Sequence, residues 1–253
     1  MTDFVNRRRA LLTLGGGGLL LAGCERIAQT KAARAAFTGA EDLTYRFNRL
    51  ITARDALAPE FTGADLSPVF RSNGNGTAAG SPDYARLLAG GFRDYRLQVR
   101  GLVARPLSIP LDHLKALPTR TQITRHDCVE GWSAVGQWTG VPLRLVLNAA
   151  GLASAARYIV FHCFDATGGV PYYESIDLID AFHPQTILAW GLNGKMLPVA
   201  NGAPLRLRVE RQLGYKHAKY VRAIEAVASL DAIGGGKGGY WEDVSDYAWY
   251  AGI

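Results

Sequence analysis

The segment Arg125-His126-Asp127-Cys128-Val129-Glu130-Gly131-Trp132-Ser133 sets a cysteine between a strand-like run and a glycine turn. The preceding residues 122–125 are expected to form a strand, which places the sulfur of Cys128 at a sheet edge. Arg125 and His126 are expected to lower the pKa of the thiol and to favour the thiolate, the form that binds soft metals. From the residues alone, Cys128 is a candidate reactive cysteine, and structural burial or a disulfide is the commoner explanation.

Cysteine usage leaves two interpretations open. The chain contains three cysteines, Cys24, Cys128 and Cys163. If Cys24 carries a lipid, the other two remain in an oxidising compartment, where they can form one disulfide. Alternatively they are kept apart, and one of them is reserved for a metal.

The N-terminus has the features of an export signal. Arg7, Arg8 and Arg9 precede the uncharged, mostly apolar residues 10–22, a run too short to span a bilayer. Adjacent arginines before a weakly hydrophobic run are typical of the twin-arginine route. The run ends in Leu21-Ala22-Gly23-Cys24, which resembles a lipoprotein cleavage box; cleavage at Ala33-Arg34-Ala35 is the alternative. We therefore predict an export signal over 1–24 and a tether over 25–40, with the protein in the periplasm or on the extracytoplasmic membrane surface, anchored by lipid at Cys24.

Composition and charge fit an ordinary globular protein. The chain has 253 residues, of which 48% are hydrophobic and 20% are charged. Removal of residues 1–23, which carry Asp3 and three arginines, lowers the formal charge from +6 to +4. This balance is far below the footprint of a nucleic-acid-binding protein, and no basic run with interleaved aromatics occurs. We expect no nucleic-acid partner.

Hydrophobic patterning predicts a mixed α+β fold, rich in sheet, in a single domain over residues 41–253. Helices are expected over 42–59, over 111–117, and over 142–150 with Pro142 at the start and Gly151 after the end. A turn is expected at Asn193-Gly194. Strands are expected over 95–99, 158–164, 186–190, 205–209 and 221–227.

The cysteine segment, together with Trp138-Thr139-Gly140-Val141-Pro142-Leu143, resembles the oxidoreductase molybdopterin-binding domain family. That family includes sulfite oxidases and bacterial periplasmic methionine sulfoxide reductase catalytic subunits. The resemblance runs from about Tyr95 to about Val227. It implies a sulfite-oxidase-type fold and a molybdenum–molybdopterin cofactor, with Cys128 as the single protein ligand to the metal.

Further segments agree with the resemblance and suggest which residues bind the cofactor. Asn201-Gly202-Ala203-Pro204-Leu205-Arg206 resembles the family's pterin-binding turn and strand, and Gly214-Tyr215-Lys216-His217-Ala218-Lys219 resembles the loop that meets the pterin phosphate. Arg206 is expected to bind the phosphate bidentately, with Lys216 and Lys219 as point charges. The implied cofactor-binding residues are Asn73, Cys163, Asn201, Arg206, His217, Ala218 and Lys219.

The resemblance also implies a reaction, the transfer of an oxygen atom. Sulfite oxidases carry an arginine three residues after the ligand cysteine, whereas this chain has Gly131. The chain also leaves no room for the dimerisation domain of those enzymes, so we expect a monomer. We predict reduction of a small or protein-bound S-oxide or N-oxide, such as methionine sulfoxide. Oxidation of sulfite or another small sulfur compound is one alternative, and a non-enzymatic lipoprotein with a Cys128–Cys163 disulfide is another.

The sequence indicates that electrons are exchanged with a separate protein. No haem-attachment C-x-x-C-H motif and no flavin fingerprint occurs in the chain. A haem protein or a membrane subunit is therefore the expected electron-transfer partner.

Overall fold

A computed structural model describes residues 30–78 and 80–253. The chain divides into two compact units, residues 1–51 and residues 52–253, and the latter is called the main unit below. The predicted export signal over 1–24, with Cys24, lies outside the described residues. None of the helices within the described residues is long and apolar enough to cross a membrane.

The first unit contributes one described helix, α2 (Lys31–Ile51). It begins inside the segment expected to be a tether, because the alanines at 32–40 have high helix propensity. It ends at Ile51, earlier than the expected end near Pro59. The main unit starts at Thr52, whereas the sequence predicts a domain that starts at residue 41.

The main unit contains two sheets, and the first is mixed, with five strands in the order β2-β1-β10-β5-β6. β1 runs parallel to β10, whereas the other neighbours are antiparallel. The pairing of β1 with β10 brings together segments far apart in the sequence. The strands are β1 (Arg96–Gly101), β2 (Leu107–Pro110), β5 (Tyr158–Thr167), β6 (Val170–Asp177) and β10 (Val221–Val227).

The second sheet has the order β3-β4-β7-β8, with β9 paired to β7. β3 and β4 form a hairpin whose last pair is Cys128 with Trp132, which confirms that the cysteine ends a strand at a turn. Gly131 in that turn has φ +84°, a conformation that glycine adopts without strain. The strands are β3 (Arg120–Cys128), β4 (Trp132–Pro142), β7 (Ile187–Leu192), β8 (Lys195–Met196) and β9 (Arg206–Arg208).

Short helices connect the strands. α5 begins at Leu143, one residue after the predicted start at Pro142, and Gly151 follows its end with φ +70°, as the sequence predicts. The predicted turn at Asn193-Gly194 joins β7 and β8, and both residues have positive φ. The helices are η1 (Gly63–Asp65), α3 (Pro82–Ala89), α4 (Leu111–Ala116), α5 (Leu143–Ala150), α6 (Leu178–Ala181), η2 (Val199–Asn201), η3 (Gly214–Lys216) and α7 (Tyr240–Ser245).

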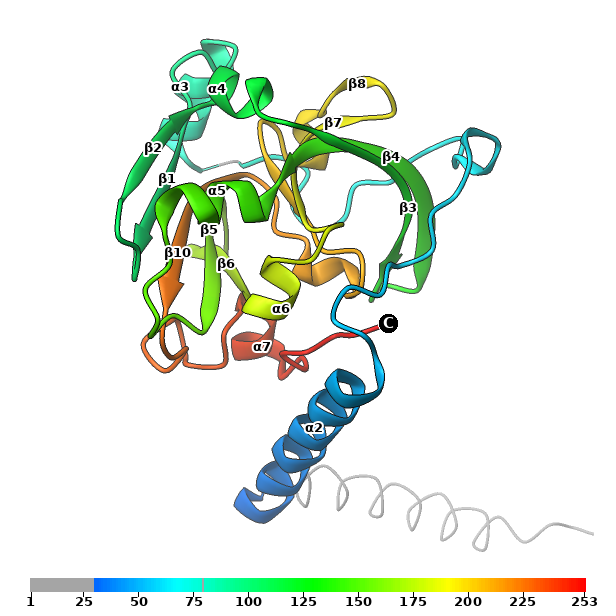
Figure 1. Ribbon diagram of the computed structural model, residues 1–253, viewed down its shortest axis with the longest axis vertical. Coiled ribbons are helices and arrows are strands. Elements are labelled where there is room, and N and C mark those ends of the chain that lie inside the picture. Colours follow the sequence, from blue (N-terminus) through cyan, green and yellow to red (C-terminus); the bar gives the residue numbers. More distant parts are fainter. Residues whose placement is uncertain (1–29, 79) are drawn as a thin grey trace, which may run out of the picture. The chain divides into compact units, whose positions relative to one another are not determined.

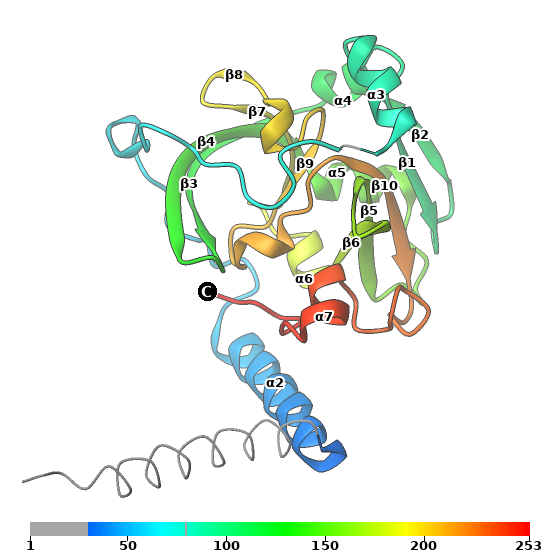
Figure 2. The ribbon, with the colours of Figure 1, turned by 180° about the vertical axis from the view of Figure 1, so that it is seen from behind.

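The two sheets lie on opposite sides of the main unit, as both views show (Figures 1 and 2). The largest apolar cluster takes side chains from both sheets and α5, including Val99, Leu147, Phe161, Leu207 and Ile224. The segment from β9 to β10, which contains η3, passes between the sheets close to the end of β3. The predicted mixed, sheet-rich α+β fold is confirmed.

Candidate functional site

A cavity of about 280 Å³ opens beside Cys128. Five segments of the chain form its wall: the loop after η1, the turn after β3, the β5–β6 hairpin, the region around η3, and the region around α7. Of the residues predicted to bind the cofactor, Asn73, His217 and Lys219 line it. Its lining is Asn73, Gly74, Asn75, Cys128, Val129, Glu130, Asp165, Thr167, Tyr172, Gly214, Tyr215, His217, Lys219, Trp241 and Tyr247.

Cys128 keeps its thiol proton to a higher pH than an ordinary cysteine does. Burial raises its pKa, and the Glu130 carboxylate raises it further. The prediction that Arg125 and His126 lower this pKa is therefore wrong. Arg125 is paired with Asp127 at 2.9 Å, and burial lowers the pKa of His126 so that its ring is neutral. A bound metal cation would itself displace the thiol proton.

Lys219 joins the loop around Asn73 and Asn75 to Ala200 of η2. Its Nζ donates to the main-chain oxygens of Asn73 at 2.6 Å and Ala200 at 3.0 Å, and also to that of Asn75. Burial and the neighbouring Arg206 lower the pKa of this ammonium to about 7. Lys219 lies on the cavity wall, as predicted for a cofactor-binding residue, and its charge changes near neutral pH.

Arg206 and Asn201 lie behind the cavity wall. Arg206 is fully buried, and its Nη1 and Nη2 donate to the Asn201 oxygen at 3.2 Å and to Asn73 Oδ1 at 3.1 Å. Burial and the nearby Arg208 lower the pKa of Arg206 to about 9. Nε of Arg206 and Nδ2 of Asn201 have no partner within the described chain. Nη1 therefore holds Asn201 and Nη2 holds the Asn73 loop, and the bidentate contact of Arg206 with a phosphate stays a prediction.

His217 and Ala218 follow η3 and are buried. Nε2 of His217 donates to the Gln212 oxygen at 3.0 Å, while Nδ1 is buried without a partner among the described residues. Burial and the neighbouring Arg208 lower the pKa of His217, so the ring is neutral. The Ala218 oxygen accepts from Leu207 N–H at 2.8 Å, which ties this segment to β9.

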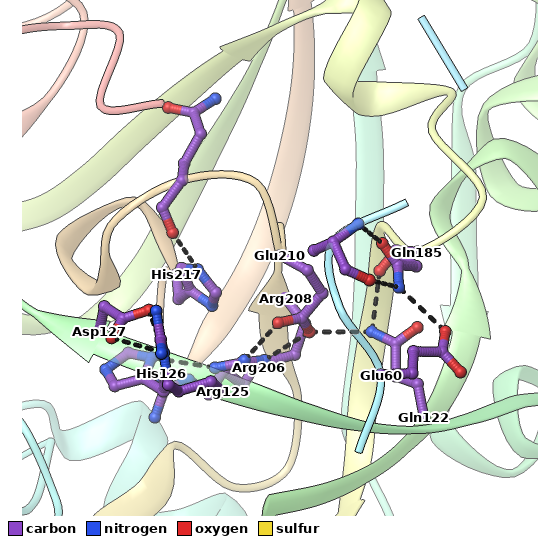
Figure 3. Close-up of polar contacts among 12 residues, drawn as sticks. Glu60, Gln122, Arg125, His126, Asp127, Gln185, Arg206, Arg208, Glu210 and His217 are labelled. Carbon is purple, nitrogen blue, oxygen red and sulfur yellow. Dashed lines mark hydrogen bonds and ion pairs between the residues drawn. The ribbon is translucent and has the colours of Figure 1, made fainter. Parts of the chain in front are cut away.

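A buried polar network runs behind the Cys128 strand, and sequence reasoning missed it. Nη1 of Arg208 lies 3.0 Å from Nδ1 of His126, and its Nε lies 2.9 Å from Glu210 Oε1. The same carboxylate oxygen accepts from Gln122 at 2.8 Å. Figure 3 shows the hydrogen bonds running from His126 through Arg208 and Glu210 to Gln122.

Two residues with predicted roles lie elsewhere. Lys216 is fully buried between Glu174 and Glu242, so it is not available as a phosphate ligand. Cys163 lies in the apolar core on β5, beside a separate cavity of about 220 Å³ rather than the one beside Cys128. Cys128 and Cys163 are both free thiols, which contradicts the alternative of a disulfide between them.

Several lining residues were not among the predicted cofactor-binding residues. Asp165 has Oδ2 at 3.3 Å from Asn75 Nδ2, and its Oδ1 is buried without a partner in the described chain. The Tyr172 hydroxyl donates to the Tyr215 oxygen at 2.8 Å. Glu130 stands inside the cysteine motif and could have been found from its position. The others come from segments that only the tertiary fold brings together.

Comparison with known proteins identifies relatives of this chain. The profile of the oxidoreductase molybdopterin binding domain matches residues 88–231. A putative protein-methionine-sulfoxide reductase subunit of Azospira oryzae is 44% identical over 158 residues, which cover 62% of this chain and 56% of that protein. Catalytic subunits of protein-methionine-sulfoxide reductase from Xanthomonas campestris pv. campestris and Xanthomonas axonopodis pv. citri are each 37% identical over 172 residues, covering 63% of this chain and 52% of theirs.

The chain spans about half the length of these relatives. Among solved structures, sulfane dehydrogenase SoxCD from Paracoccus pantotrophus aligns with a TM-score of 0.49 and 24% identity, over 54% of this chain and 39% of that one. The matched domain covers more than half of the present chain and contains Cys128, Asn201, Arg206 and Lys219. The chain belongs to the oxidoreductase molybdopterin-binding domain family.

Proposed function

We propose that the protein is a molybdenum–molybdopterin oxidoreductase that reduces an S-oxide or N-oxide, with methionine sulfoxide, free or protein-bound, as the model substrate. The observation that carries the proposal is the position of Cys128, at the end of β3 in the family's motif and on the wall of the cavity. One thiolate is enough, because the two dithiolene sulfurs of molybdopterin complete the set of soft ligands. When bound, the cofactor would supply a metal that changes between two oxidation states and thereby supports oxygen-atom transfer.

The residues around the cavity fit such a cofactor. Buried polar atoms rarely lack partners in native proteins, yet several gather here. Lys219 and Arg206 add positive charge for a phosphate, and Gly202 and Gly214 let the main chain approach closely. Asn73, His217, Ala218 and Lys219 are the residues proposed to hold the cofactor, with Cys128 on the metal. Buried atoms without a partner in the described chain include His126 Nε2, Asp165 Oδ1, Asn201 Nδ2, Arg206 Nε and His217 Nδ1.

The cavity wall favours a neutral oxide over an anion. Tyr172, Trp241 and Tyr247 provide aromatic surface, while Glu130 and Asp165 bring two carboxyl groups to the same wall. The Nζ of Lys219 already donates hydrogen bonds to main-chain oxygens. Sulfite is an anion and would meet the Glu130 carboxylate without the arginine that Gly131 replaces, so electrostatic repulsion opposes its binding.

Asp165 is suited to deliver a proton. Reduction of an S-oxide to a sulfide takes up two electrons and two protons and releases water. Burial raises the pKa of the Asp165 carboxyl, which favours its protonated form, and this side chain lines the cavity. We assign to it the transfer of a proton to the departing oxygen.

The electrons are proposed to come from a separate protein. The names of the relatives, "subunit" and "catalytic subunit", describe parts of larger assemblies. A haem protein or membrane subunit would supply the electrons. We also retain the proposal that the protein is exported by the twin-arginine route, with a lipid on Cys24, as a periplasmic or membrane-surface monomer.

A steady-state assay with two substrate classes tests the reaction. Protein from a host that makes molybdopterin is supplied with a reduced viologen dye and methionine sulfoxide, and separately with sulfite and an electron acceptor. We expect S-oxide reduction to exceed sulfite oxidation by at least about 100-fold in kcat/KM, a difference of roughly 3 kcal/mol in transition-state binding. Rapid sulfite turnover without S-oxide reduction would overturn the proposal.

A further inference from the structure

His126 and Cys128 lie on the same face of β3. Side chains alternate along a strand, so residues two apart point in the same direction. The His126 ring contacts that of His217, with centroids 5.1 Å apart, and His217 lines the cavity. A molybdopterin bound through Cys128 would therefore lie over the face from which His126 projects.

The glycine opposite His126 shows how closely the η3 loop approaches it. A Cβ at Gly214 would lie 2.5 Å from both Nε2 and Cε1 of His126. Gly214 also lines the cavity. The edge of the ring that carries Nε2 therefore faces the cavity-lining loop.

Arg208 determines which nitrogen of His126 carries the proton. An arginine side chain has donors and no acceptor, so Nδ1 of His126 must accept from Arg208 Nη1 at 3.0 Å. The ring proton is then on Nε2. The Glu210 carboxylate accepts hydrogen bonds from Nε and Nη2 of Arg208. It also accepts one from Nε2 of Gln122. The orientation of the imidazole is fixed by a buried chain of partners (Figure 3).

The resulting Nε2–H group is buried and has no acceptor among the described residues. His126 as a whole is 1% exposed, so bulk water does not serve it. Buried donors of this kind call for a ligand or an ordered water. Burying the three polar side chains behind it, those of Arg208, Glu210 and Gln122, would cost free energy without benefit if the ring had no further task.

We propose that His126 is a further cofactor-binding residue, whose Nε2–H donates to an acceptor atom of the molybdopterin held at Cys128. Arg208 and Glu210 are positioning residues that act through His126. The inference rests on the proposed function only in requiring that molybdopterin is bound; it does not depend on the substrate that is turned over.

Two isosteric variants test the proposal. The amide nitrogen of His126→Gln lies near the place of Nε2 and retains the donor, whereas the amide of His126→Asn lies near the place of Nδ1 and retains only the partner of Arg208. The holoproteins are compared by pterin and molybdenum content per chain and by the midpoint potential of the Mo(V) electron paramagnetic resonance signal. We expect His126→Gln to stay within about 2-fold of wild type in cofactor content, and His126→Asn to fall at least about 5-fold or to shift the potential.

If the role of His126 is purely structural, His126→Asn should keep more cofactor than His126→Gln, because only His126→Asn keeps the Arg208 contact. That result overturns the proposal, and so does a result in which both variants match wild type in cofactor content and potential. A wild-type protein that contains no molybdopterin would instead contradict the proposed function. Should the variants fail to fold, nitrogen-15 spectra of histidine-labelled wild-type holoprotein decide. The Nε2–H tautomer with a hydrogen-bonded Nε2 shift supports the proposal, and an Nδ1–H tautomer or a free Nε2–H overturns it.

Discussion

At the scale of single residues, the site combines a thiol with buried, partly unsatisfied polar groups. Cys128 has a raised pKa and lies beside Glu130, so a bound cation rather than the neighbouring side chains would drive its deprotonation. Lys219 and Arg206 remain buried at the cost of lowered pKa values. Such groups are retained in a fold when they serve a ligand.

Gly214 is predicted to be irreplaceable. In Gly214→Ala the new methyl group would overlap the His126 ring, so the η3 loop or the imidazole must move. We expect molybdopterin content per chain to fall at least about 5-fold, as measured by the fluorescence of the oxidised pterin. Gly63→Ala is the control, because Gly63, like Gly214, does not have a positive φ, and a Cβ there meets no atom within 4 Å. Equal loss of pterin in both variants would contradict the prediction.

Asp165→Asn removes the proposed proton donor while keeping the shape of the side chain. We expect kcat for S-oxide reduction to fall by about 100-fold or more, since general acids contribute on that order. Molybdenum content should remain that of the wild type, which separates a catalytic loss from a failure to bind the cofactor. A fully loaded Asp165→Asn enzyme with unchanged kcat at every pH would show that the proton comes from another group.

At the scale of elements, the β3–β4 hairpin presents the cysteine and the β9–β10 segment closes over it. The chain entering the main unit is clamped onto this arrangement by Gln185, whose amide accepts from Ala58 N–H at 2.8 Å and donates to the Ala58 oxygen at 3.0 Å. The Nε2 of His183 donates to the Ala56 oxygen at 3.0 Å, and its Nδ1 accepts from Gln185 N–H at 3.2 Å.

His183 is predicted to make stability depend on pH. Burial lowers its pKa below the ordinary value of 6.5, so its contribution is present above pH 6.5 and is lost as the pH falls toward the folded-state pKa. In urea unfolding, the stability difference between wild type and His183→Asn should shrink by about 1 kcal/mol for each pH unit below 6.5. Gln185→Ala has no titrating group at the changed position, so its stability loss should be similar at pH 7.5 and 5.5. A pH-independent effect of His183→Asn would refute this assignment.

Local sequence patterns predicted helices and strands well where hydrophobic alternation or a proline or glycine at an end determines the element. Val221–Val227 is a run of apolar and alternating residues and forms β10 over those residues, and Pro142 and Gly151 bound α5. Arg206-Leu207-Arg208 looks like a strand with one face in water, yet all three are buried. The partners that allow this, Glu210 and His126 among them, come from another strand and turn, and local periodicity contains no information about them.

The candidate site was predictable to the same extent. The cysteine motif pointed to Cys128, and the segments after Asn201 and Gly214 pointed to Lys219 and His217. The role of Lys216 was wrong, because the sequence does not show that Glu174 and Glu242 converge on it. The sequence shows aromatic residues near the C-terminus, but the position of Trp241 and Tyr247 on the cavity wall depends on the tertiary fold.

At the scale of the whole main unit, Lys216 joins three distant segments. Its ammonium lies 2.7 Å from Glu242 on α7 and also contacts Glu174 on β6, while Lys216 itself belongs to η3. All three side chains are almost completely buried. The cluster therefore fixes the C-terminal segment, which supplies Trp241 and Tyr247 to the cavity, against the loop that supplies Gly214.

Lys216→Met should destabilise the fold strongly, because it leaves two buried carboxyl groups without their cation. We expect a loss of about 3–5 kcal/mol in the free energy of unfolding, measured by urea denaturation. The matched control is Lys237→Met, which removes an exposed ion pair with Asp246 and should cost under about 0.5 kcal/mol. Similar losses in the two variants would mean that the buried cluster does not join these segments.

The central claim is that Cys128 holds molybdenum carried by molybdopterin. The most direct measurement is the molybdenum and pterin content per chain of wild type and Cys128→Ala, purified from the same molybdenum-competent host, with Cys163→Ala as the matched cysteine control. We predict close to one molybdenum per wild-type chain, little or none in Cys128→Ala, and an unchanged content in Cys163→Ala. Wild-type protein without molybdenum, or equal molybdenum in Cys128→Ala, would contradict the claim.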